Sequence, residues 1–181
     1  MSGIWRQSLR RRWPPRLEIL DNAKVERVVV LGRGGAGKTT FAHRLGSHAG
    51  LPVVTLDDHF WRPGLKPLSF NEWATVQRRL ASEDRWIMDG DLGPYDVLPI
   101  RLARADTVLM LDFNLLRCAW QAHRRSRESW DFWRWVVSYR RHHRPRVVAA
   151  VATYAPQATF TVLRHPRALA DFFHELAGNS E

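Results

Sequence analysis

Short apolar runs alternate along this chain with longer stretches in which apolar and polar residues mix. The runs are rich in Val, Ile and Leu and have the length of buried strands, whereas the stretches between them have the apolar spacing of helices. Turn-forming residues separate many of the segments. We expect five strands, at residues 28–31, 53–56, 86–90, 107–112 and 159–163.

Helix signals fall between the expected strands. Ser69 and Glu72 have the capping-box spacing that begins a helix. Pro166 and Gly178 stand where an early proline and a late glycine delimit a last helix. Alternation of strands and helices predicts an α/β fold, with a five-stranded parallel sheet and helices on both faces. The expected helices span residues 38–48, 69–81 and 166–178.

Charge divides the chain into unequal parts. The 181 residues carry a net charge of +10, and 45% of them are hydrophobic, which suffices for one compact domain. Residues 1–24 hold six Lys or Arg against two acids, and residues 117–146 hold nine Arg against two acids. We expect a basic N-terminal extension over 1–24 and one domain over 25–181. Arginine without lysine favours oxyanion binding, although a solvated helix face remains the alternative.

Other features narrow the class of protein. No run of about 18 uncharged apolar residues is present, and the N-terminus lacks the apolar stretch of a secretory signal. The single cysteine, Cys118, has no partner for an internal disulfide or a zinc cluster. We therefore expect a cytoplasmic protein with no membrane contact.

A glycine-rich turn follows the first expected strand. Residues 32–39, GRGGAGKT, match the pattern G-x-x-x-x-G-K-[ST] directly before the first expected helix. In that setting backbone N–H groups surround phosphates, Lys38 reaches the β- and γ-phosphates, and Thr39 ligates Mg²⁺. A flexible turn that matches by chance is the alternative. The predicted nucleotide-binding residues are Gly32, Arg33, Gly34, Gly35, Ala36, Gly37, Lys38, Thr39 and Thr40.

Four segments in order carry a resemblance: GRGGAGKTT, LDDHFWRPG, WIMDG, and RLARADTVLMLD before an arginine-rich stretch. With them the chain resembles small P-loop kinases of the adenylate kinase and shikimate kinase type. It is more closely similar to bacterial proteins often labelled "DNA topology modulation protein". The resemblance covers residues 28–176 and implies a nucleoside-monophosphate-kinase-like fold with an Arg/Trp-rich helical lid. It also implies ATP and Mg²⁺ as cofactors.

The resemblance gives roles to acids at two strand ends. Asp57 resembles the acid that such kinases place near the acceptor hydroxyl or the metal, and Asp58 is a candidate to share that task. Asp89 resembles a Walker-B carboxylate that holds Mg²⁺ together with Thr39. Turn-capping acids and a helix cap are the alternative interpretations. Asp91 departs from the uncharged residue expected after the Asp89-Gly90 step.

The resemblance also places an acceptor pocket beside these acids. Trp61 and Arg62 are candidates for one wall, although an aromatic residue in such a loop often only anchors it. Arg101 occupies the position of an acceptor-binding arginine. The predicted acceptor-binding residues are Asp58, Trp61, Arg62, Gly90 and Arg101.

A helix from about 114 to 143 would bring three arginines near one face. In the resembling kinases, lid arginines neutralise the transferring phosphoryl group. We expect Arg124 to be catalytic and Arg117 and Arg127 to bind the nucleotide. Solvent-facing arginines above packed tryptophans are the alternative. Asp112 and Asn114 are expected to begin the helix.

These features together predict a Mg²⁺-dependent phosphotransferase. It would move the γ-phosphoryl of ATP to a small acceptor, with a nucleotide or nucleoside-like molecule favoured. Basic residues interleaved with aromatics also describe a nucleic-acid surface, so an NTPase associated with nucleic acid is one alternative. A P-loop protein with a regulatory ATP site and no turnover is another. The oligomeric state and the preference for ATP over GTP stay open.

Overall fold

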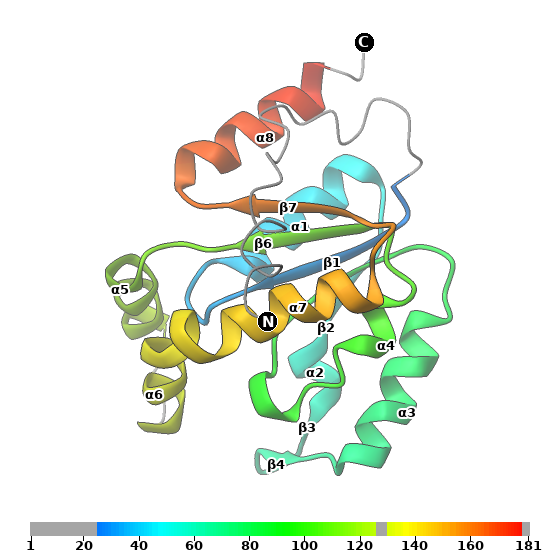
Figure 1. Ribbon diagram of the computed structural model, residues 1–181, viewed down its shortest axis with the longest axis vertical. Helices are drawn as coiled ribbons and strands as arrows, with labels where there is room; N and C mark the ends of the chain where they lie inside the picture. Colours follow the sequence, from blue (N-terminus) through cyan, green and yellow to red (C-terminus); the bar gives the residue numbers. More distant parts are fainter. Residues whose placement is uncertain (1–24, 126–129, 179–181) are drawn as a thin grey trace, which may run out of the picture.

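Five parallel strands form the centre of the molecule. The structure is a computed structural model that describes residues 25–125 and 130–178 (Figure 1), so the basic extension expected over residues 1–24 lies outside the described residues. The strand order is β2-β5-β1-β6-β7, which confirms the expected parallel sheet. The strands are β1 (Arg27–Gly32), β2 (Val53–Thr55), β5 (Trp86–Asp89), β6 (Thr107–Leu111) and β7 (Thr159–Leu163).

Helices cover both faces of the sheet because the side chains of β1 alternate between two apolar cores. Val28 and Val30 pack with one helix group, and Val29 and Leu31 with the other. The first group is α1 (Lys38–Ala49) and α8 (Pro166–Gly178), and the second is α3 (Phe70–Ala81), α4 (Pro99–Leu102) and α7 (Arg144–Tyr154) (Figure 1). All three expected helices are present, and α3 begins with the predicted capping box at Ser69 and Glu72.

Short elements at one end of the sheet were not expected from the sequence. α2 (Leu56–Phe60) follows β2 without a loop, and the strands β3 (Trp61–Arg62) and β4 (Lys66–Pro67) form a small antiparallel pair. A 3₁₀ turn, η2 (Gly93–Tyr95), follows β5. These elements hold the polar residues that follow β2 and β5 in fixed backbone conformations.

The arginine-rich region differs from the single helix expected over 114–143. It contains α5 (Leu115–Arg125) and α6 (Trp130–Ser138) as separate helices, with residues 126–129 outside the described part. A π-helical turn, η3 (Tyr139–His143), then leads into α7, which the sequence analysis missed. Pro145 explains the irregular turn, because proline cannot donate the hydrogen bond that a continuous α-helix needs at its position. Within the described ranges, no helix is long and apolar enough to cross a membrane.

Candidate active site

The glycine-rich turn joins the central strand to α1 at the carboxyl edge of the sheet. Gly32 ends β1 with φ 142, and a Cβ there would lie 2.4 Å from the carbonyl oxygen of Leu111 in β6. Only glycine therefore allows the two strands this close approach. Gly37 is the N-cap of α1 with φ 82 and provides no side-chain cap. The backbone N–H groups in the first turn of α1 are therefore not capped by a side chain of the N-cap residue.

Lys38 folds back over this turn. Its Nζ donates to the carbonyl oxygens of Gly32, at 2.9 Å, and Arg33, at 3.2 Å. The ammonium therefore lies at the mouth of the turn, where the phosphates of a nucleotide would replace carbonyl oxygens as partners. The motif residues predicted from the sequence are thus brought together as one loop.

Asp89 ends β5 beside the loop. Its side chain is 2% exposed, and its Oδ1 has no hydrogen-bond partner among the described residues. Burial raises the pKa of this carboxyl group, while the charge of Lys38 and a hydrogen bond from Thr39 oppose that rise. A buried oxygen without a partner is costly unless a ligand satisfies it. The pair of Thr39 hydroxyl and Asp89 carboxylate fits a Mg²⁺ ion, which prefers hard oxygen ligands.

Asp57 is close enough to Asp89 for its charge to raise the pKa of that group further. Its own side chain is exposed in α2, and its Oδ1 accepts a hydrogen bond of 3.2 Å from Nε1 of Trp61. Asp58 is exposed as well and has no hydrogen bond or ion pair with another described residue. An exposed carboxylate, that of Asp57, therefore lies near the buried one, and Asp58 is exposed next to it along the chain.

Trp61 and Arg62 have mixed surroundings. The indole of Trp61 is 39% exposed and packs edge-on against Phe60, with ring centroids 4.8 Å apart. Arg62 forms an ion pair with Glu72, the acid of the α3 capping box. The wall predicted from the sequence thus contains an aromatic ring, while its arginine is neutralised by a carboxylate.

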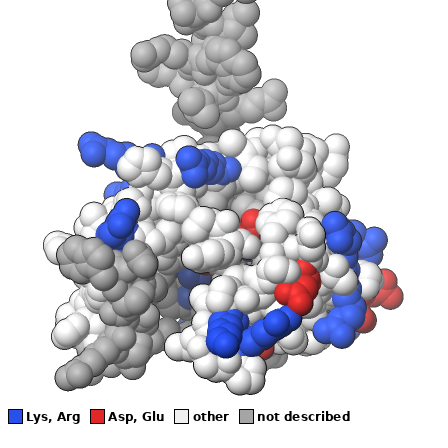
Figure 2. Space-filling view, turned by 90° about the horizontal axis from the view of Figure 1, so that it is seen from below, with Lys and Arg blue, Asp and Glu red and all other residues white. Residues whose placement is uncertain are grey.

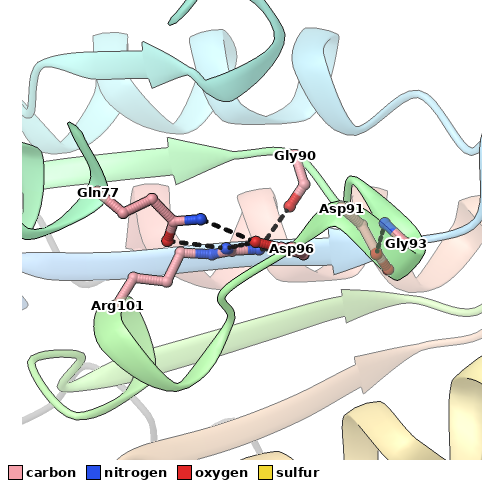
Figure 3. Close-up of polar contacts among 6 residues, drawn as sticks. All are labelled: Gln77, Gly90, Asp91, Gly93, Asp96 and Arg101. Atoms are coloured by element: carbon pink, nitrogen blue, oxygen red, sulfur yellow. Dashed lines mark hydrogen bonds and ion pairs between the residues drawn. The ribbon is translucent and has the colours of Figure 1, made fainter. Parts of the chain in front are cut away.

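Arg101 lies in a different environment from the one expected of an acceptor ligand. Its side chain is 0% exposed, and its guanidinium donates to both carboxylate oxygens of Asp96, at 2.6 and 2.7 Å. It also donates to Gln77, at 3.2 Å, and to the carbonyl oxygen of Gly90, at 3.0 Å (Figure 3). A direct contact with an acceptor would require these bonds to open. In this structure Arg101 instead fixes the backbone at Gly90, another predicted acceptor residue.

Asp91 follows that fixed backbone and is a functional candidate whose partners the sequence did not reveal. Its Oδ1 accepts from the N–H of Gly93 at 3.1 Å, and its Oδ2 accepts from the hydroxyl of Tyr139 at 3.4 Å. Burial, followed by the charge of Asp96, raises the pKa of Asp91, while Lys38 and Arg101 oppose the rise. The unexpected charge at this position was the one signal in the sequence.

Aromatic rings from α6 and η3 cover Asp91. Trp135 packs edge-on against Tyr139, and His143 stacks on Tyr139 with ring planes 13° apart. A Cβ on Gly93 would lie 2.9 Å from the indole nitrogen of Trp135, so this glycine lets α6 approach the η2 turn. Burial lowers the pKa of His143, so its ring is neutral at pH 7.

Arg33, the second residue of the glycine-rich turn, is 2% exposed. Its guanidinium carbon lies 5.6 Å from the centre of the Tyr139 ring, and its Nε and one terminal nitrogen have no partner among the described residues. Burial is the main cause that lowers its pKa, and the charge of Arg140 adds to it. The loop therefore contains a desolvated cation with free donors.

A polar pocket of about 360 Å³ opens near these residues and is lined by Asp112, Arg140, Arg144 and Arg164. Asp112 accepts from Arg140 at 3.3 Å and from Arg144 at 2.9 Å. The sequence suggested that Asp112 and Asn114 begin a helix. Asn114 does cap α5 by accepting from the N–H of Arg117 at 2.9 Å, whereas Asp112 ties the end of β6 to η3 and α7.

The predicted lid arginines are only partly visible. Arg117 is exposed, and its guanidinium lies 5.7 Å from the centre of the Phe113 ring. The side chain of Arg124 and the whole of Arg127 lie outside the described part of the chain. Their roles stay predictions.

The described surface does not form a continuous basic face in the view of Figure 2. Lys and Arg side chains stand in separate groups there, with uncharged surface between them and Asp and Glu side chains among them. A broad nucleic-acid interface would need a connected basic surface on the side that meets the backbone phosphates. This face of the described residues gives the nucleic-acid alternative no support.

Solved structures with a similar fold include shikimate kinase from Acinetobacter baumannii, at 16% identity and a TM-score of 0.60 over 84% of this chain and 91% of that one. This comparison decides the architecture. The chain has the fold of small P-loop kinases. A gluconokinase from Sinorhizobium meliloti 1021 is similar at 17% identity and a TM-score of 0.51, over 87% and 93% of the two chains. A sugar kinase from Janibacter sp. HTCC2649 reaches 19% identity and a TM-score of 0.50, over 85% and 95%. Neither a family model nor a curated protein matches the sequence.

Proposed function

We propose that this P-loop kinase fold transfers the γ-phosphoryl group of ATP to a hydroxyl group of a small acceptor in a Mg²⁺-dependent reaction. One observation carries the proposal. The buried Asp89 has an oxygen without a partner, and it lies beside Thr39 and Lys38 at the mouth of the glycine-rich turn. A carboxylate held in this way needs a cation, and the loop beside it suits the phosphates that would share that cation.

The residues of the site divide the work. The backbone of the turn and Lys38 hold the phosphates, while Thr39 and Asp89 hold Mg²⁺, which when bound neutralises charge on the phosphate oxygens. Asp57 orients the acceptor hydroxyl and takes its proton. The acceptor oxygen forms a bond to the γ-phosphorus as the bond to the bridging oxygen of ADP breaks. Catalysis then rests on positioning and electrostatic stabilisation.

The names of the similar structures support a small acceptor, because they are kinases of shikimate, gluconate or a sugar. The resemblance of the sequence to adenylate kinase-related proteins, including those labelled "DNA topology modulation protein", favours a nucleotide or nucleoside-like acceptor within that range. Arg124, Arg117 and Arg127 are the proposed lid residues that neutralise the transferring group.

Consumption of MgATP by the full chain tests the proposal. The acceptors are nucleosides, nucleoside monophosphates and small polyols, with DNA and RNA in separate reactions. Lys38→Ala is expected to lower acceptor-dependent turnover by about 10²-fold or more, because it removes a charge that acts on the transferring phosphoryl group. Lys66→Ala, which removes an exposed lysine of β4, is the matched control and is expected to leave turnover unchanged.

The outcomes separate the three functions. Turnover that depends on a small acceptor and on Lys38 supports the kinase. Hydrolysis stimulated by nucleic acid alone would replace it with the NTPase alternative. Tight MgATP binding with no turnover on any acceptor would favour the regulatory site.

A further inference from the structure

We infer that the acceptor is a neutral or ammonium-bearing hydroxyl compound, and that acceptors with a carboxylate or phosphate group are disfavoured. The inference rests on the proposed function and narrows its acceptor to one charge class, which keeps nucleosides and neutral or amino polyols and sets nucleotides aside. It comes from the charges that face the acceptor side of the glycine-rich turn.

Two arginines on this side, Arg101 and Arg62, are already paired with carboxylates of the chain. The carboxylate of Asp96 holds Arg101 by two hydrogen bonds, and neither side chain is more than 5% exposed. Figure 3 shows the guanidinium turned toward Asp96, Gln77 and Gly90. An anionic acceptor would have to break a buried ion pair to reach this arginine, and that costs far more than a surface contact returns. Arg62 is likewise paired, with Glu72.

Asp57 and Asp91 have only neutral hydrogen-bond partners among the described residues. Asp57 accepts from an indole N–H, and Asp91 accepts from a backbone N–H and a tyrosine hydroxyl. Asp58 has neither a hydrogen bond nor an ion pair within the described ranges. Asp57 and Asp91 thus lie near the loop without an ion pair to any arginine or lysine of the described residues. Lys38 is directed to the loop carbonyls, where phosphates bind.

Aromatic rings complete this surface. Tyr139 and His143 stack near Asp91 with Trp135 edge-on to both rings, and Trp61 lies beside Asp57. A carboxylate backed by aromatic faces suits a cation, which gains from both groups, and rings also pack on the apolar faces of a neutral polyol. Burial lowers the pKa of His143, which favours the neutral form of its ring at pH 7. These groups offer an anion hydrogen-bond donors that already bond Asp57 and Asp91, and no cation to pair with it.

A charge-matched series tests the inference. Glucosamine, glucose and gluconate share a carbon skeleton but differ in charge, and adenosine and AMP form a second pair. Phosphorylated products are measured by mass spectrometry with MgATP at constant ionic strength, and the ligand-induced change in Tm is measured in parallel. We expect kcat/KM for the ammonium or neutral members to exceed that of their anionic counterparts by about tenfold or more, or about 1.4 kcal/mol.

Asp91→Asn tests whether this carboxylate causes the preference. The variant is expected to narrow the gap between glucosamine and gluconate several-fold. Asp84→Asn makes the same change of charge at an exposed position before β5, at the opposite end of that strand, and is expected to leave the gap unchanged. Equal effects of the two variants would overturn the inference.

Failure of the inference and failure of the proposed function give different experimental results. Preferred phosphorylation or tighter binding of gluconate or AMP overturns the inference and leaves the kinase in place. If no member of any charge class is phosphorylated or changes the Tm, and ATP consumption does not depend on Lys38, both fail together.

Discussion

Two arginines are buried to nearly the same degree in this protein, and their surroundings differ completely. Arg101 is 0% exposed and donates to a carboxylate, an amide and a backbone carbonyl. Arg33 is 2% exposed and leaves two nitrogens without a partner among the described residues. Arg101 keeps an unbonded Nε but has a carboxylate as its counter-ion, whereas the donors of Arg33 without partners are buried at a cost.

The difference separates two regions of the site. Around Arg101 the chain meets its own electrostatic needs, so the backbone from Gly90 to Asp96 is fixed before any ligand arrives. Arg33 is instead a buried cation with free donors, and Lys38 lies near the buried Asp89, one of whose oxygens has no partner among the described residues. The first region fixes the backbone of the site, and the second is suited to bind phosphates and a cation together.

The largest change in stability is expected from breaking the buried ion pair of Arg101 and Asp96. Arg101→Met leaves Asp96 buried without a counter-ion and is expected to lower the free energy of unfolding by about 3–5 kcal/mol. Urea denaturation followed by circular dichroism measures the change. The double variant Arg101→Met with Asp96→Leu removes both charges and is expected to recover most of the loss. A loss below about 1 kcal/mol in the single variant would contradict the comparison.

The second prediction concerns the incomplete partner set of Arg33. Arg33→Met removes a desolvated charge with free donors, so the free energy of unfolding is expected to stay within about 1 kcal/mol of the original or to rise. Affinity for MgATP is expected to fall by about tenfold, through loss of a charge-assisted contact to phosphate. Calorimetric titration measures the affinity. Arg44→Met, on the exposed face of α1, is the control and should not change it.

A smaller change in stability is expected from the ionisation of Asp91, and this change depends on pH. Its pKa is raised in the folded state, so its charged form opposes folding, and this penalty grows as pH rises from the ordinary range of an aspartate through the raised pKa. Asp91→Asn is therefore expected to raise Tm at pH 7, with the gain closing toward pH 4. Thermal unfolding over that pH range measures it. A constant difference from pH 4 to pH 7 would contradict the assignment.

The smallest effect is expected from an arginine that is paired but exposed. The side chains of Arg62 and Glu72 are 53% and 48% exposed, so water and salt screen their attraction. Arg62→Ala is expected to shift Tm by no more than about 2 °C, and addition of salt should reduce that shift. A loss of stability near that of Arg101→Met would show that pairing, and not burial, decides the cost.

The fold was accessible from the sequence because its signals are local. Most strands of the sheet contain a short apolar run, such as VVVL in β1 and VLML in β6. The loop residues from Gly32 to Thr39 are consecutive, so their arrangement follows from neighbours along the chain. The capping box at Ser69 and Glu72 spans a single turn. Such features need no knowledge of tertiary contacts.

The remainder of the site depends on packing between distant elements. Arg101 meets Gln77 only because α4 packs against α3, so its position before β6 could not distinguish an acceptor ligand from a buried ion pair. Asp112 joins Arg140 and Arg144 through the π-helical turn, which no local pattern predicted. The aromatic stack over Asp91 likewise forms from α6 and η3 against the end of β5.

The strand order also has a consequence for synthesis. β1 lies at the centre of the sheet, yet Val28 pairs with Ile87 on one side and Thr107 on the other. At translation rates of about 5–20 residues per second, this apolar strand leaves the ribosome several seconds before either neighbour exists. Until then, the apolar side chains of β1 can associate only with other apolar segments of nascent chain. Productive folding begins late, once β6 has emerged, and chaperones that shield the N-terminal part should raise the yield.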